Sequence, residues 1–288
     1  MSAQLKLKLA QLNRLRFAPS CPDARWQVSL DEESELHRLE LAWIEKQRSQ
    51  IVQRARDVPR DPGAFIAWFE SLKLDGPGQG DPLFPWLAEH ATLDQMKWFL
   101  RQEVAGEAGF DDLVALTQVR MPEQAKLELA ANYWDEMGRG HRGGMHRPML
   151  SHMAAELELE SRPDEIVWES TALGNLLAGL AANRRYAYQS IGALGVVELT
   201  APGRAELVNA GLERLGIGPA TRQYYALHAT LDVKHSEAWN REVVVPLVSD
   251  DPSLAPLIAE GALLRLEAGA ACFARYRDEL RVDQARAA

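Results

Sequence analysis

Residues 122–140 read PEQAKLELAANYWDEMGRG, and this stretch has the features of an α-helix with both ends marked. Pro122 stands before an acidic first turn at Glu123, and Gly138-Arg-Gly140 follows the apolar run. Proline suits a helix start because it lacks an N–H that the first turn leaves unpaired, and glycine suits the end because it adopts the left-handed conformation there. The stretch therefore predicts a helix over 122–137.

Similar turn signals divide the rest of the chain after residue 85 into a succession of helices. The only β-branched clusters lie at 193–197 and 243–245, and no Asn-Gly or Asp-Gly turn joins alternating strands. The pattern predicts an all-α bundle of about seven core helices. The expected helices are 92–106, 111–119, 122–137, 147–159, 164–182, 184–200, 203–215, 219–245 and 251–282.

The N-terminal part of the chain has a different character. Residues 32–57 place apolar side chains at helical spacing among dense charge, which predicts an amphipathic helix on the outside of the main body. Residues 58–85 are rich in proline and glycine and predict a loop with one short helix at AFIAWFESL, 64–72. We expect residues 1–84 to form an N-terminal helical extension and residues 85–288 the main helical domain.

Composition limits the function classes. The chain has 288 residues, 47% apolar and 25% charged, within the globular range, and its net charge of −9 argues against nucleic acid or an anionic membrane as a partner. No apolar stretch is long enough for a membrane span, and the N-terminus lacks the apolar segment of a secretory signal. Because Cys21 and Cys272 are the only cysteines, we expect a cytoplasmic protein without a disulfide framework or a cysteine-rich zinc site.

Three metal-type donors share one face of the expected helix 219–245. At 100° per residue, His228, Asp232 and His235 fall within a 60° stripe. A single helical histidine is most often a core or surface residue, but three donor residues at i, i+4 and i+7 favour a metal site. The stripe is the clearest chemical signal in the sequence.

Other acids and histidines stand where a packed helix would bury them. Glu198 follows small and apolar turns with no neutralising neighbour, although a helix-end glutamate facing water would explain it too. Glu136 and His146 flank a glycine-rich segment that can return the chain on itself, whereas we interpret His141, inside that segment, as a solvated loop residue. Glu103 lies on the inward face of its helix, where an arginine from a neighbouring helix could instead satisfy it.

The resulting donor set contains carboxylates and histidines but no sulfur, which suits iron or manganese. Six or seven ligands exceed what one catalytic metal with open positions would use, so two metals are indicated. The Glu-x-x-His motif of ferritin-type bundles occurs nowhere in the chain. A different helical scaffold is therefore expected. The candidate ligands are Glu136, His146, Glu198, His228, Asp232 and His235, with Glu103 in reserve.

The chain resembles the heme-oxygenase-like di-iron oxidases, often described as iron-containing redox enzymes. The order Glu, His, distant Glu and His-x-x-x-Asp-x-x-His matches that family, and four phrases look like its local signatures. They are FLRQE (99–103), NYWDEMG (132–138), ALGNLLAGLAANRRYAYQSIGALGVVEL (172–199) and HATLDVKHSEAW (228–239). The resemblance covers roughly residues 85–282 and implies a heme-oxygenase-like bundle, two weakly held iron ions and O2 as co-substrate.

The resemblance also implies which residues of this chain correspond to the family's metal ligands. The family's second-helix Glu falls on Glu136 and its mid-chain Glu on Glu198, and its last-helix ligands fall on the His228 stripe. The family's first histidine usually follows its Glu by a few residues, whereas His146 follows by ten. Glu103 corresponds to an upstream ligand present in some members.

The leading hypothesis is an O2-dependent di-iron oxidase acting on a small amine, amino acid or fatty-acid-like substrate, with an external reductant and a homodimer as further expectations. One alternative is a non-catalytic helical binding protein. Another is a cofactor-independent or thiaminase-like enzyme on the same bundle, but Cys272, its candidate nucleophile, has no neighbouring base in the sequence.

Overall fold

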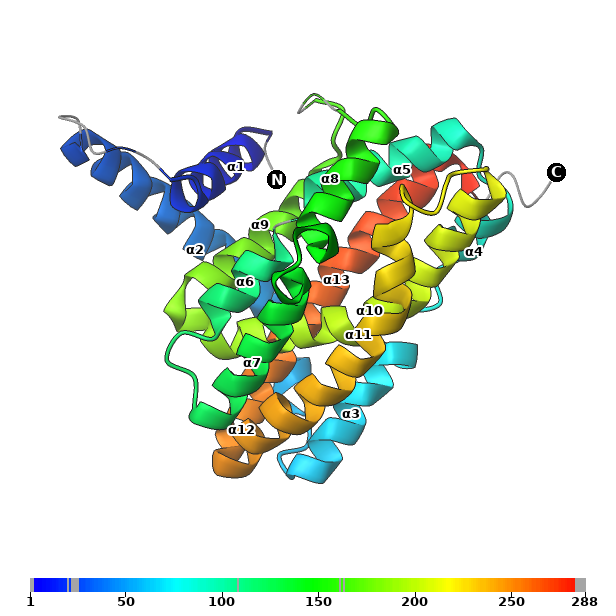
Figure 1. Ribbon diagram of the computed structural model, residues 1–288. Helices are drawn as coiled ribbons and strands as arrows, with labels where there is room; N and C mark the ends of the chain where they lie inside the picture. The colour runs from blue at the N-terminus through cyan, green and yellow to red at the C-terminus, as the bar shows by residue number, and fades with distance from the viewer. Residues whose placement is uncertain are drawn as a thin grey trace.

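The computed structural model describes residues 3–19, 21, 26–107, 109–160, 162 and 164–282. These residues form helices and no β-strand, and an isolated bridge joins Met137 and Met145. The all-α prediction is confirmed (Figure 1). The helices are α1 (Ala3–Phe17), α2 (Trp26–Arg56), α3 (Pro62–Asp75), α4 (Leu83–Glu89), α5 (Leu93–Gly106), α6 (Phe110–Thr117), α7 (Glu123–Glu136), α8 (His146–Glu156), α9 (Trp168–Ala182), α10 (Ala187–Arg214), α11 (Gln223–Trp239), α12 (Val245–Asp250) and α13 (Ala255–Leu280).

Helix α10 is the centre of the bundle and packs against both α11 and α13. Its contact with α13 depends on Gly192, because a Cβ there would lie 1.8 Å from the carbonyl oxygen of Ile258. The missing side chain at this position thus makes room for helix α13. Close backbone approach of this kind fixes where the polar residues of α10 face.

The N-terminal helices contribute to the same core. Helix α2 packs on α13 and α9 through Trp43, Ile44 and Ile51, which are all buried. Its first half, with α1 beside it, extends outward from the bundle in Figure 1, and Trp26 is exposed there. Helix α4 runs through residue 85. The division of the chain near residue 84 stays a prediction.

Several helix boundaries differ from the sequence prediction by a few residues, and in two places the division into helices itself differs. The expected helices 184–200 and 203–215 are one helix, α10, with Pro202 inside it. Proline in a helix interior costs roughly 3 kcal/mol, but Pro202 is itself buried, so packing on neighbouring helices offsets the lost hydrogen bond. The expected helix 219–245 is α11, followed by a π-helical segment at Asn240–Val244 and then α12.

None of the helices in the described part of the chain combines the length and the apolar character needed to cross a bilayer.

Candidate metal centre

Four helices bring the predicted donors to one place. Glu136 is the last residue of α7 and His146 the first of α8, while Glu198 lies in the middle of α10. The remaining three, His228, Asp232 and His235, lie along α11. Of the six, all but His228 are at most 5% exposed, and His228 is half-buried. The face of α11 that helical periodicity predicted to carry metal ligands is thus turned toward the interior of the bundle.

The glycine-rich segment between α7 and α8 is a tight reversal. Met137 and Met145 pair across it, and Gly138 has a φ of 60°, the left-handed region that favours glycine. A Cβ on Gly138 would lie 2.4 Å from the carbonyl carbon of Gly144, so a side chain at this position would clash with the returning backbone. The reversal places the two helix ends next to each other.

As a result Nδ1 of His146 lies 2.6 Å from Oε2 of Glu136. The angle does not suit a hydrogen bond, and both ring nitrogens of His146 lack a hydrogen-bonding partner among the described residues. His141 is exposed in the loop, away from these donors. The prediction of His146 rather than His141 as the partner of Glu136 agrees with this geometry.

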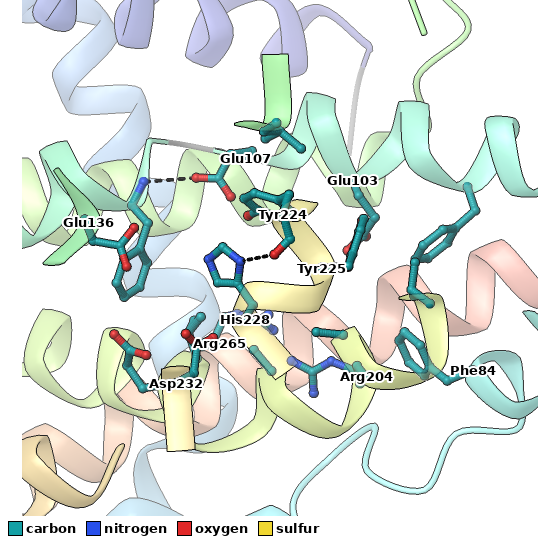
Figure 2. Close-up of a pocket in the computed structure, with 18 residues that line it drawn as sticks. Phe84, Glu103, Glu107, Glu136, Arg204, Tyr224, Tyr225, His228, Asp232 and Arg265 are labelled. Atoms are coloured by element: carbon teal, nitrogen blue, oxygen red, sulfur yellow. Dashed lines mark hydrogen bonds between the residues drawn. The ribbon is translucent and has the colours of Figure 1, made fainter. Parts of the chain in front are cut away.

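Glu136, His146 and His228 offer donor atoms within 4.8 Å of one another. The imidazole rings of His146 and His228 have centroids 4.6 Å apart. Nδ1 of His228 donates to the carbonyl oxygen of Tyr224 at 2.7 Å, which leaves Nε2 with a free lone pair (Figure 2). A cavity of about 30 Å³ is bounded by all three side chains.

A second group consists of Glu136, Glu198 and His235, again with donor atoms within 4.8 Å of one another. Asn132 donates to Oε1 of Glu198 at 2.7 Å, and Nε2 of His235 lies 3.2 Å from Oδ2 of Asp135. A histidine that donates one ring N–H to a carboxylate presents its other nitrogen to a metal. Glu136 belongs to both groups.

The two other predicted ligands lie in the larger cavity beside these groups. Asp232 is 3% exposed, and its Oδ1 has no hydrogen-bonding partner in the described chain. Glu103 also lines this cavity, but at the opposite end, next to Arg204 (Figure 2). The structure does not bring Glu103 to the donor groups.

Glu107 is a residue that the sequence analysis missed. It lies one helical turn beyond Glu103, just after α5 ends, and accepts hydrogen bonds from the backbone N–H groups of Gly109 and Phe110 at 2.9 and 3.0 Å. It lines both cavities and reaches toward Glu136 (Figure 2). The signal available in the sequence was its i+4 spacing from Glu103, which puts both carboxylates on one face.

The electrostatics are those of a carboxylate cluster without enough cations. Burial, with repulsion by Glu198, raises the pKa of Glu136 well above its usual value, and the same causes raise the pKa of Asp232 to about 10. Burial lowers the pKa of His146 and of His228 to about 4, so both are neutral near pH 7 and have lone pairs for a metal.

His235 behaves differently from the other two histidines. Burial alone would lower its pKa, but the carboxylates of Glu198 and Asp135 outweigh burial and raise it to about 9. In the absence of a metal, the proton on His235 is the main positive charge facing the acids. A metal ion would replace that proton.

The donor set fits divalent iron. Carboxylate oxygens and neutral imidazoles are the ligands of non-heme iron, and several of the atoms concerned are buried without a partner in the described residues.

A family model described as iron-containing redox enzyme matches residues 97–270, more than half of the chain. Among solved structures, the chain is similar to a domain of unknown function with a heme oxygenase-like fold from Shewanella denitrificans OS217. The TM-score is 0.54 at 16% identity, over 76% of this chain and 91% of that one. At this identity the likeness shows the fold alone, and it confirms the predicted heme oxygenase-like architecture. No curated protein matches the chain.

Proposed function

The chain belongs to the family of iron-containing redox enzymes, and from this premise we propose that it is a non-heme di-iron oxidoreductase that uses O2 to oxidise a small molecule. Membership of the family supports an oxidoreductase role. The observation that carries the finer proposal is the sharing of Glu136 between two donor groups. One group offers two histidines and the other a second carboxylate and a histidine, so each iron would have protein ligands of its own.

The residues that would hold iron are Glu136 as the shared ligand, His146 and His228 on one side, and Glu198 and His235 on the other. Asp232 and Glu107 line the adjoining cavity and are the candidates for additional ligands. Iron held by these residues would supply electrons to O2, and the reduction of O2 to two molecules of water takes up four electrons. A substrate oxidised by two electrons supplies half of them, so the proposal includes an external reductant.

Contacts within the protein orient the histidine ligands in the absence of metal. The carbonyl of Tyr224 fixes the tautomer of His228, and Asp135 orients the ring of His235. The ring of Tyr224 also packs against that of His228, with centroids 4.2 Å apart and the planes tilted, and limits how far the imidazole can rotate. These contacts hold the donor atoms in place and reduce the reorganisation that metal binding requires.

A cysteine nucleophile on the same scaffold is not supported. Cys272 is fully buried, burial raises the pKa of its thiol to about 12, and it is not among the residues that line the cavity. A thiolate is the reactive form, and it would not be populated near pH 7.

Anaerobic titration with Fe(II), followed by a colorimetric iron assay and O2-uptake measurements, tests the proposal. We expect two iron ions per chain and O2 uptake on exposure to air. Glu136→Gln should reduce binding at both positions, because it removes the shared ligand. Glu123→Gln is the matched control, an exposed glutamate in the first turn of the same helix. Undiminished binding of two irons by Glu136→Gln would overturn the assignment.

A further inference from the structure

The cavity beside the donor groups has a second, oppositely charged end. It measures about 150 Å³ and has Glu136, Asp232 and His228 toward one end and Glu103 and Arg204 toward the other (Figure 2). Arg265, from α13, lines it as well. The donors of the proposed metal site do not use these arginines.

Neither arginine has a carboxylate partner in the described chain. Arg204 hydrogen-bonds to Gln79 at 3.5 Å and Thr200 at 3.2 Å, both neutral groups. Arg265 makes no hydrogen bond to a described residue, and its Nε is buried. Glu103 acts on both arginines through space, yet no ion pair within 4.0 Å joins it to either. Both arginines are half-buried, and charged groups that are partly removed from water are normally paired, so these two are unusual.

The charges at this end do not cancel. Burial, and then the positive charge of Arg265, lower the pKa of Arg204 to about 9, so it remains protonated near pH 7. Burial raises the pKa of Glu103, and the carboxylates that act on Arg265, those of Glu103 and Glu107, form no ion pair with either arginine. Positive charges without an ion-pair partner in a partly enclosed cavity cost free energy in the empty protein, and an anion that binds there relieves this cost.

The flanking side chains favour an organic anion. The guanidinium of Arg204 lies 5.8 Å from the ring centroid of Phe84 and 5.5 Å from that of Phe273. Val208 and Leu150 line the same cavity. The fork of an arginine matches the two oxygens of a carboxylate, and apolar walls suit the hydrocarbon attached to it.

We propose that Arg204 and Arg265 hold the carboxylate of a small organic acid whose hydrocarbon part extends along the cavity toward Glu136 and His228. This inference rests on the proposed function, because it makes the acid the substrate of that site. A cavity of about 150 Å³ is enough for a six-carbon ring. Arg204 follows Glu198 by six positions on α10, a rise of about 9 Å along the helix axis, which suits a chain of roughly six carbons.

Hexanoate and hexanamide are the probes, since they have the same length and differ in charge. Isothermal titration of the full chain, both metal-free and after anaerobic loading with Fe(II), should give at least tenfold tighter binding of hexanoate. The metal-free measurement matters because iron itself can bind a carboxylate. Arg204→Gln and Arg265→Gln should each lower the affinity for hexanoate about tenfold or more and bring it close to that for hexanamide.

Arg222→Gln is the control, because Arg222 is partly buried and bonded to Asn209 and Glu213 outside the cavity. It should leave hexanoate affinity unchanged. Arg204→Lys, which keeps the charge without the fork, should bind hexanoate with intermediate affinity. Equal affinities of the metal-free wild type for hexanoate and hexanamide would overturn the inference, whether or not the variants fold.

The same samples separate the two proposals. If the protein binds two irons but shows no preference for the carboxylate, the inference about the arginines fails and the di-iron function stands. If the metal-free protein prefers the carboxylate but takes up no iron, the di-iron function fails, and the arginine pair is the anion site of a binding protein.

Discussion

Replacing Asp232 by asparagine should stabilise the metal-free protein and weaken its iron binding. Asp232 is 3% exposed, and its Oδ1 lacks a hydrogen-bonding partner in the described chain. Burial, together with the charges of Glu198 and Glu136, raises its pKa from 3.8 to about 10. In the unfolded chain the same side chain would ionise near pH 4, so folding at neutral pH requires it to take up a proton.

The size of this penalty follows from the linkage between proton binding and folding. Because the folded pKa is raised, there is no cost below pH 3.8, and the cost grows by about 1.4 kcal/mol per pH unit until the folded pKa of about 10. It amounts to about 2 kcal/mol at pH 5 and about 4 kcal/mol at pH 7. Asparagine does not titrate. The advantage of Asp232→Asn should therefore grow as the pH rises, reaching roughly 10 °C in melting temperature at pH 7.

The assay is thermal unfolding followed by circular dichroism after removal of metal, at pH 5 and pH 7, together with iron stoichiometry at pH 7. Asp135→Asn is the comparison. A hydrogen bond from Arg139 lowers the pKa of Asp135, so its carboxylate stabilises the folded state above the unfolded pKa. That variant should melt at a lower temperature than the wild type, and the loss should diminish as the pH falls through the pKa of Asp135.

If Asp232 had a structural role, its replacement by asparagine would lower the melting temperature of the metal-free protein. If Asp232→Asn melts below the wild type at pH 7, or if its stability advantage is the same at pH 5 and pH 7, the buried carboxylate is not the source of strain that we infer. Full retention of two irons by the variant would also exclude Asp232 as a ligand.

Three further predictions concern the metal and the cysteines. Removing metal with a chelator should leave the far-ultraviolet dichroism nearly unchanged, because the buried apolar side chains of the bundle hold it together without metal, and loss of helicity would indicate a structural metal. His146→Ala should lose at least one iron per chain while His141→Ala retains both, and the opposite result in an iron assay would exchange their roles. In the native protein, thiol reagents should modify Cys21, which is exposed, whereas Cys272 should react only after the protein is denatured. Two rapidly modified thiols in the native protein, counted by mass spectrometry, would contradict the burial of Cys272.

The sequence predicted the helices well wherever local signals mark their ends. Helix α7 begins and ends within one residue of the expected bounds, because Pro122 and Gly138 act within a single turn. The sequence prediction was wrong at Pro202. Proline usually breaks a helix, but Pro202 is buried against neighbouring helices and α10 continues through it. The short helix α4 also went unpredicted, since its proline-rich surroundings have the composition of a loop. Tertiary packing decides both cases, and it is not visible in a local window.

The residues of the candidate site were likewise predictable where local sequence fixes their relative positions, and not where tertiary packing does. The α11 stripe was predictable because one helix fixes the relative positions of its own residues. Glu136 and His146 were predictable because four glycines between them allow a reversal. Glu103 and Glu107 share a helical face, and only the packing of α5 decides which one faces the donors. Arg204 and Arg265 come from two different helices, so no spacing in the sequence connects them.

The two ends of the cavity complement each other. The acids around Glu136 offer a carboxylate substrate no cation partner of its own, whereas Arg204 and Arg265, which form no ion pair with a described residue, attract it. An organic acid can therefore enter with its carboxylate toward the arginines, and its hydrocarbon part is left facing the donor groups. Because the arginines hold the carboxylate at the end of the cavity away from the donor groups, loading with metal should alter the affinity for hexanoate less than Arg204→Gln does. Orientation of the substrate is then set by the protein's fixed charges before iron takes part.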